Sequence, residues 1–77
     1  MEWWTGMRIE PDAHRFRWYT IALQPTLWPT WEGWTMWGRL GLHVRGRQLL
    51  FEGTREDALH AVSRRRQRKE QRGYQTM

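Results

Sequence analysis

The sequence predicts an α+β fold, in which a small antiparallel β-sheet of three to four strands carries one C-terminal helix on a face. Between residues 14 and 52, short segments alternate with period two and are separated by Gly and Pro. From residue 54 onward, a helix start signal precedes residues at helical spacing. The chain has 77 residues, enough for one domain. We assign that domain to residues 14–77 and treat residues 1–13 as a possibly flexible N-terminal arm without clear periodicity.

The first expected strand covers residues 14–24. Tyr19, Ile21 and Leu23 recur at every second position, in side-chain types that favour strands. Pro25 then ends the strand, because proline has no N–H to donate to a neighbour. One face of this strand is therefore expected to be buried.

The second expected strand covers residues 33–40, and alternation divides it into two faces. We expect Trp37 and Arg39 to share the face that points outward. The opposite set is expected to belong to the core and consists of Trp34, Met36, Gly38 and Leu40. The alternative is that the helix or the loop at residues 28–31 covers Trp37, since Trp is more often buried than exposed.

A hairpin bracketed by Gly41 and Gly46 leads into a third strand at residues 47–52. The helix follows, and Thr54 is the expected N-cap. Its first turn carries acidic side chains, and an apolar stripe of Ala58, Ala61, Val62 and Arg65, with Leu59 at its edge, is expected to pack on the sheet. Gly73 is the expected helix terminator, and a short return strand or packed tail follows it.

The net charge of +5 lies at one end of the chain. Residues 63–77 hold six cations and one acidic residue, whereas residues 1–62 hold seven charges of each sign. A localised basic cluster indicates a phosphate-bearing or acidic partner. A solvated helix face is an equally good explanation of this pattern by itself.

The sequence offers no catalytic constellation. The three histidines are scattered and form no HExxH pattern, Ser63 is the only serine, and no glycine-rich loop opens a helix. There is no cysteine for a disulfide or thiolate metal site, and no apolar run approaches the about 20 residues of a membrane span. We therefore expect a cytoplasmic protein that is no enzyme and uses no cofactor, metal or membrane.

Four segments in this order resemble the WGR domain family. They are Leu27-Trp28-Pro29-Thr30-Trp31, Trp37-Gly38-Arg39-Leu40-Gly41, the helix start Thr54-Arg55-Glu56-Asp57-Ala58 preceded by Phe51, and Lys69-Glu70-Gln71-Arg72-Gly73-Tyr74. The match to the family pattern covers about residues 14–77, nearly the whole chain. Trp28 and Pro29 stand where the family usually has Phe and Gly, and we expect Trp28 to fill the same apolar pocket. Met36 stands at a position that is often basic in the family, which suggests a self-association surface.

The resemblance implies a function as well as a fold. WGR domains occur in DNA-damage-dependent poly(ADP-ribose) polymerases and in bacterial regulators and stand-alone proteins, and in the polymerases they bind DNA at strand breaks. The motif Trp packs on a sugar there, which would be the role of Trp37, and the motif Arg makes contacts with neighbouring domains, which would be the role of Arg39. Gly38 and Gly41 would be structural, and Tyr74 corresponds to the family's Gly-Tyr.

The sequence and the resemblance together predict a non-catalytic nucleic-acid-binding module, bacterial and possibly nucleoid-associated, that prefers DNA ends or nicks. The expected nucleic-acid-binding residues are Trp37, Arg39, Arg45, Arg47, Arg64, Arg68, Lys69, Arg72 and Tyr74. One alternative is a protein-interaction module that docks an acidic partner or a second copy of itself. Another alternative is RNA binding.

Overall fold

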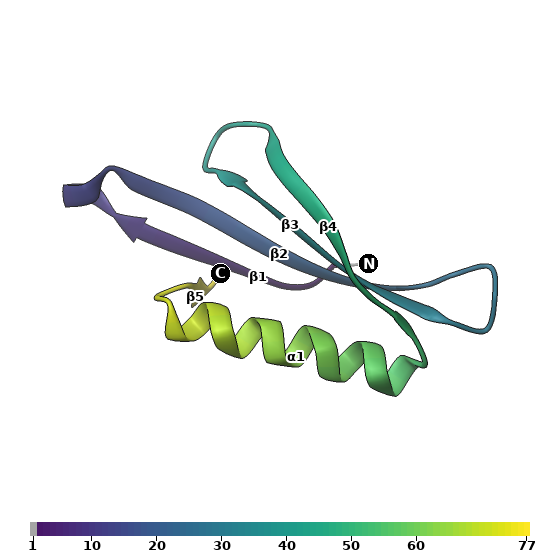
Figure 1. The fold of residues 1–77 in the computed structure, drawn as a ribbon. Helices are drawn as coiled ribbons and strands as arrows, with labels where there is room; N and C mark the ends of the chain where they lie inside the picture. The colour runs from purple at the N-terminus through teal and green to yellow at the C-terminus, as the bar shows by residue number, and fades with distance from the viewer. Residues whose placement is uncertain (1) are drawn as a thin grey trace.

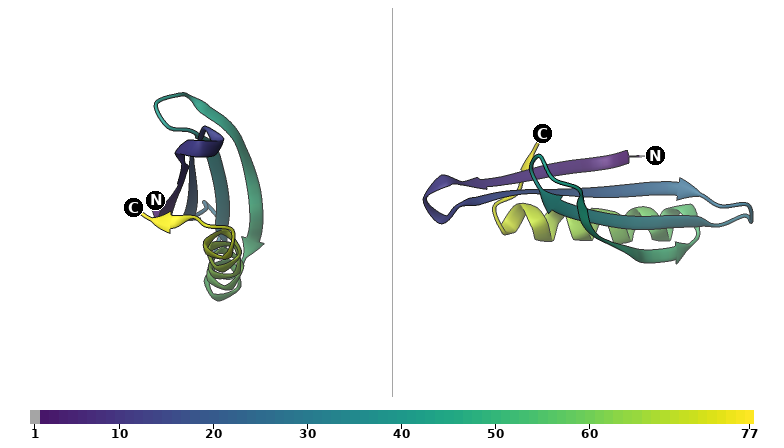
Figure 2. Two further views of the ribbon diagram at one scale, coloured as in Figure 1. Left: turned by 90° about the vertical axis from the view of Figure 1, so that its left-hand side faces the viewer. Right: turned by 90° about the horizontal axis from the view of Figure 1, so that it is seen from above.

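A computed structural model describes residues 2–77. They form one five-stranded antiparallel sheet in the order β4-β3-β2-β1-β5, with one helix packed against it (Figure 1). The elements are β1 (Glu2–Glu10), a 3-10 turn η1 (Pro11–Ala13), β2 (Arg15–Pro25), β3 (Trp31–Arg39), β4 (Val44–Gly53), α1 (Arg55–Gln71) and β5 (Gln75–Thr76). Figure 2 shows two layers, with the helix along one face of the curved sheet. The α+β prediction is confirmed.

Strand β1 occupies a segment for which the sequence predicts no regular element. It pairs along its length with β2, from Glu10 opposite Arg15 to Glu2 opposite Ala22, and it pairs with β5 on its other side. The register shifts between Glu2 and Trp4. An irregularity of this kind breaks the period-two pattern, which is why alternation misses the strand. Residues 2–10 are therefore part of the sheet and not a separate arm.

The helix covers the face of β3 that carries Gly33, Thr35 and Trp37. A Cβ on Gly33 would lie 2.8 Å from a methyl carbon of Val62, and Thr35 is fully buried. The predicted core face of β3 is therefore wrong. Trp34 and Met36 are half-buried on the uncovered face, Leu40 is exposed, and only Gly38 of that set is buried. Small residues on the other face let the helix approach closely, which alternation alone does not reveal.

The core lies between the helix and strands β1, β2 and β3. Its buried side chains are Trp4, Tyr19, Ile21, Val62 and Tyr74, and Ile21 and Val62 are fully inaccessible to solvent. Tyr19, Ile21 and Leu23 are buried on the helix side of β2, as their alternation predicts. The apolar stripe of the helix is also confirmed, since Ala58 and Val62 are fully buried.

Both ends of α1 are capped as the sequence predicts. Thr54 accepts a hydrogen bond from the backbone N–H of Asp57 at 3.1 Å. At the other end, Gly73 has φ of +99°, and the N–H groups of Gly73 and Tyr74 donate to the carbonyls of Glu70 and Lys69. This pair of hydrogen bonds is the Schellman motif, which favours glycine at its left-handed position. It turns the chain so that Tyr74 enters the core and β5 pairs with β1.

The loop between β2 and β3 is ordered, but its apolar residues are not anchors. The Thr26 side chain donates to the Trp28 carbonyl at 3.1 Å, and its hydroxyl lies 2.6 Å from that of Thr30. Leu27 is fully exposed and Trp28 is 76% exposed. The expectation that Trp28 fills an apolar pocket is therefore wrong, because the two-strand ladder carries this tip beyond the body of the domain (Figure 1).

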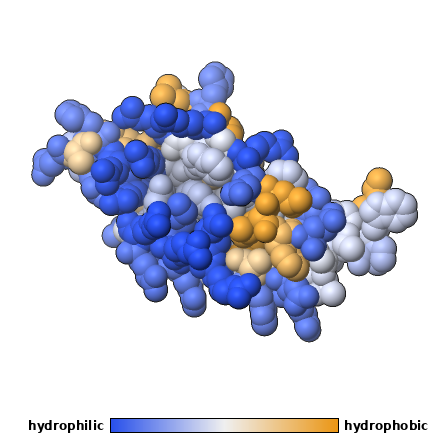
Figure 3. Space-filling model, viewed as in Figure 1, coloured by the Kyte–Doolittle hydropathy of each residue, from blue (hydrophilic) through white to orange (hydrophobic). Residues whose placement is uncertain are grey.

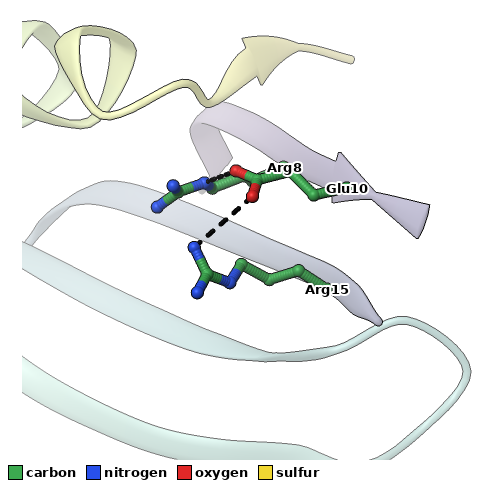
Figure 4. Close-up of polar contacts among 3 residues, drawn as sticks. All are labelled: Arg8, Glu10 and Arg15. Atoms are coloured by element: carbon green, nitrogen blue, oxygen red, sulfur yellow. Dashed lines mark hydrogen bonds and ion pairs between the residues drawn. The ribbon is translucent and has the colours of Figure 1, made fainter. Parts of the chain in front are cut away.

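A cluster of charges holds the opposite hairpin, which joins β1 and β2. The Glu10 carboxylate accepts from Arg8 and lies 3.5 Å from a guanidinium nitrogen of Arg15 (Figure 4). The hydrogen bond from Arg8, followed by the positive charges of Arg8, Arg15 and Arg17, lowers the pKa of Glu10. Glu10 is thus occupied by two arginines of its own hairpin.

Candidate nucleic-acid interface

An open pocket of about 390 Å³ lies between the C-terminal half of α1 and strands β2, β3 and β4. Its lining residues come from widely separated parts of the chain and are Arg17, Trp18, Tyr19, Trp37, Gly38, Arg39, Arg45, Gln48, Arg65, Lys69 and Tyr74. In the space-filling view, a pale area above the C-terminal half of the helix is bordered by hydrophilic surface (Figure 3). We call this feature the basic-aromatic pocket.

Aromatic rings form the floor of the basic-aromatic pocket. Tyr19 and Trp37 are directly paired across β2 and β3, and their rings are stacked with centroids 6.2 Å apart and planes 12° apart. Tyr74 meets Tyr19 edge-on at 6.0 Å. The indole of Trp37 extends across β4 over Gly46, where a Cβ would lie 2.4 Å from the ring. The absence of a side chain at Gly46 is therefore what lets the indole lie over β4.

Five cations surround this floor, and no acidic residue lines it. They are Arg17, Arg39, Arg45, Arg65 and Lys69. Arg65 donates to the hydroxyl of Tyr19 at 2.9 Å, and the Lys69 ammonium lies 4.3 Å from the centroid of the same ring. These cation–aromatic contacts hold positive charge close to the aromatic surface.

Arg39 is held from another direction. Its guanidinium donates to the carbonyl of His14 at 3.2 Å, on the hairpin between β1 and β2. The backbone of His14 has φ of +50°. This contact positions an exposed arginine at the rim of the pocket while leaving its other donors available. Arg39 has five N–H donors, and a phosphate or carboxylate can take them in pairs.

Lys69 is the most electrostatically perturbed group of the pocket. Its partial burial is the main reason that its pKa is lowered, and the positive charges of Arg72, Arg65, Arg68 and Arg17 lower it further. In the described structure, no acidic side chain forms an ion pair with the five pocket cations. An anion that enters the pocket therefore relieves repulsion as well as gaining attraction.

Of the nine predicted site residues, the structure brings five together in the basic-aromatic pocket: Trp37, Arg39, Arg45, Lys69 and Tyr74. Trp37 and Arg39 share one face, as predicted. That face is the one the helix packs on, so Trp37 is half-buried and not turned away from the fold. Tyr74 is buried and contributes only part of its ring to the pocket.

The other four predicted residues lie outside the lining. Arg47 is on the opposite face of the sheet, 4.6 Å above the ring of Trp34. Arg64, Arg68 and Arg72 are exposed on α1 or at its end, and two of them are close enough to lower the pKa of Lys69. They form a basic rim beside the pocket.

Six lining residues are not among the nine predicted site residues: Arg17, Trp18, Tyr19, Gly38, Gln48 and Arg65. Arg17 pairs with Arg39 across β2 and β3, and Tyr19 pairs with Trp37. The signal that could have found them is the alternation of Arg17 and Tyr19 on one face of β2. Only the register of β2 against β3 connects that face with the Trp-Gly-Arg motif.

Comparison with protein families matches residues 6–77 to the WGR domain. The chain belongs to the WGR domain family. The match covers nearly the whole chain, and the family is known as a non-catalytic, nucleic-acid-binding module. No curated protein and no solved structure gives a significant match to this WGR domain.

Two further findings concern residues 2–77. No three residues among His, Cys, Asp and Glu come together in this part of the chain in a way that could hold a metal ion. The one helix of the described region is too polar to cross a membrane.

Proposed function

We propose that this WGR domain binds nucleic acid through the basic-aromatic pocket and prefers DNA that carries an end or a nick. The observation that carries the proposal is the composition of the pocket, which combines a flat aromatic floor with five cations and no acidic residue. Aromatic rings offer stacking surfaces for a base or sugar, and guanidinium and ammonium groups neutralise the phosphates on either side.

The shape of the pocket supports the proposed preference for ends. The exposed part of Trp37 lies at the bottom of a concave surface between the helix and the β3–β4 hairpin. Inside an intact duplex, neighbouring base pairs cover the base faces. A terminal or nicked nucleotide leaves a base or sugar face open to stacking. The family resemblance supports the same ligand, since WGR domains of the polymerases bind DNA at strand breaks.

In this proposal the residues have distinct roles. Trp37 stacks on the exposed nucleotide, while Arg39, Arg45 and Lys69 hold nearby phosphates. Arg65 holds the Tyr19 hydroxyl through a hydrogen bond of 2.9 Å, and the Lys69 ammonium lies 4.3 Å from the centroid of the same ring. The exposed arginines of the helix, Arg64, Arg68 and Arg72, follow the phosphate backbone outside the pocket.

Two arginines of β4 provide a matched test. Arg45 lines the pocket, whereas Arg47 lies on the opposite face of the sheet. The Arg45→Gln and Arg47→Gln variants lose the same charge, and their affinity for a fluorescent nicked duplex is measured by anisotropy over a series of salt concentrations. We expect Arg45→Gln to weaken binding and to reduce the salt slope by about 0.9, the contribution of one phosphate contact. Equal losses in the two variants would rule out the pocket as the binding surface.

Competitors then identify the ligand. A nicked circle should compete better than the same circle after ligation, and equal competition would reject the preference for ends and nicks. Single-stranded RNA is a second competitor. If it displaces the nicked duplex at lower concentration than unlabelled nicked duplex does, RNA replaces DNA as the proposed ligand.

A further inference from the structure

The face of the sheet that α1 leaves uncovered carries an apolar surface. Five of its large side chains are between 36% and 53% exposed: Ile9, Phe16, Leu40, Val44 and Leu49. Strand register places Ile9 beside Phe16, and it places Val44 and Leu49 on the side of β3 that faces away from the helix. Figure 2 shows α1 on the other side of the sheet, whereas on this side the tip of the β3–β4 hairpin curls over β2 and β1. We call it the open face.

Half-buried aromatic and sulfur-containing side chains fill the centre of the open face. Trp34 lies opposite Leu49, and Met36 lies opposite Arg47 on β4. Trp18 pairs with Gly38, whose added Cβ would lie 3.0 Å from the indole, so Trp18 lies flat across β3. The strands below are hydrogen-bonded to one another, so the centre of this surface offers side chains to a partner, whereas the outer edge of β4 pairs with no strand of the described residues.

The size of this surface lies near the upper end of what a soluble monomer exposes in one patch. Five large side chains exposed by about a third to a half, with half-buried Trp18, Trp34 and Met36 between them, amount to on the order of 500 Å² of apolar area. Soluble monomers rarely expose much more than that in one patch, and stable dimers bury about 800 Å² on each partner. Polar residues at the rim can supply the rest.

The distribution of charge favours a second copy of the same chain as the partner. The excess positive charge lies at residues 63–77, on and after the helix, so two copies that meet through their open faces hold these segments on opposite outer sides. On β3 and β4, the open face carries one cation, Arg47, and the acidic pair Glu32 and Glu52. Like-charge repulsion between two copies in this orientation is therefore small.

The positions of these charges also suit two-fold symmetry. Along β3, the row of Met36 and Arg47 lies two residues from the row of Trp34 and Leu49. The row of Glu32 and Glu52 lies two residues away in the other direction. A two-fold axis can lie in the plane of the interface, perpendicular to the strands and passing through the Trp34 row. This axis brings Arg47 of each copy against the row of Glu32 and Glu52 of the other copy.

We propose that this WGR domain forms a symmetric homodimer through the open face. The two sheets pack with their strands roughly aligned, Trp34 and Leu49 at the centre and Arg47 paired with Glu32 and Glu52 of the second copy. The helices and the basic-aromatic pockets lie on the two outer sides. The proposal does not depend on the nucleic-acid function, because its central residues Trp34, Leu49 and Arg47 do not line the basic-aromatic pocket.

Sedimentation equilibrium and light scattering of the purified protein, without nucleic acid, test this dimer. The wild-type mass should move from monomer to dimer with rising concentration. The Leu49→Lys variant places a charge at the centre of the interface and should remain monomeric. Leu27→Lys is the matched control, since Leu27 is fully exposed at the tip of the loop between β2 and β3 and should leave the dimer intact. Val44→Lys repeats the test at a second exposed position if Leu49→Lys fails to fold.

The charge pairing has its own test. Arg47→Glu should weaken dimerisation, because it places a third carboxylate against Glu32 and Glu52 of the second copy, whereas Arg45→Glu should leave it unchanged. A wild-type mass that stays monomeric up to high micromolar concentration overturns the proposal. A folded Leu49→Lys variant that still dimerises overturns the assignment to the open face, as does equal dimerisation of the two arginine variants.

Discussion

Replacing Trp37 by alanine separates the stacking contribution of the basic-aromatic pocket from its charge. The substitution removes the aromatic surface that lies on Tyr19 and over Gly46, and it leaves all five pocket cations in place. Loss of a stacking aromatic costs about 1–3 kcal/mol of binding free energy, which weakens the affinity roughly 5- to 150-fold. The slope of affinity against salt should stay unchanged, because no phosphate contact is lost.

The domain should survive this substitution. Truncating a fully buried Trp costs about 3–5 kcal/mol, and Trp37 is only half-buried, so about half of that is expected. A domain of this size has a free energy of unfolding of roughly 4–12 kcal/mol. A thermal melt, followed by circular dichroism, checks that the variant is folded at the temperature of the binding assay.

Trp28→Ala is the matched control for the loss of an indole. Trp28 is 76% exposed at the tip of the loop between β2 and β3 and does not line the pocket. Anisotropy with a labelled nicked duplex should show wild-type affinity for Trp28→Ala and weakened affinity for Trp37→Ala at every salt concentration. A folded Trp37→Ala variant with wild-type affinity would refute the stacking role. A reduced salt slope would show that the indole acts by positioning a cation.

Two pH-dependent effects follow from the described charges. Burial and the neighbouring arginines lower the pKa of Lys69, so affinity for nucleic acid should fall as pH rises through that lowered pKa, before an ordinary lysine would lose its charge. Lys69→Arg should flatten this fall in anisotropy titrations from neutral to alkaline pH, because arginine stays charged, and an equal fall in the variant contradicts the role of Lys69. The folded-state pKa of Glu10 is lowered, chiefly by the hydrogen bond from Arg8. The ionised carboxylate therefore stabilises the fold at pH values above the unfolded-state pKa, and this contribution is lost as pH falls through the folded-state pKa. Thermal melts should therefore show a smaller loss of stability on acidification for Glu10→Gln than for the wild type, and identical pH profiles would contradict this.

Features that depend on neighbouring residues could be predicted from the sequence. Thr54 caps the helix through the N–H three residues away, and Gly73 ends it through bonds to the last turn. The alternation of Tyr19, Ile21 and Leu23 identified a strand with a buried face, since side chains two residues apart always share a face. The Trp-Gly-Arg motif also consists of neighbouring residues, and together with the other motifs it identifies the family.

Features that depend on contacts between distant segments could not be predicted in this way. Both faces of β3 carry large apolar side chains, so alternation could not decide which one the helix covers. The small size of Gly33 and Thr35 decides that the helix covers their face, because these two residues allow close approach of Val62. The bulge near Trp4 concealed β1, and Trp28, expected in a pocket, lies at an exposed tip.

The sequence by itself determined strands β2 to β4, the helix and its caps, the family and the presence of Trp37 and Arg39 on one face of a strand. Only the tertiary structure decided that this face lies against the helix and forms the wall of a pocket. Strand register placed Tyr19 beside Trp37, and helix packing brought Arg65 and Lys69 onto Tyr19. The physical reason is that local patterns are set by backbone geometry over a few residues, whereas the pocket depends on which face of the sheet the helix covers.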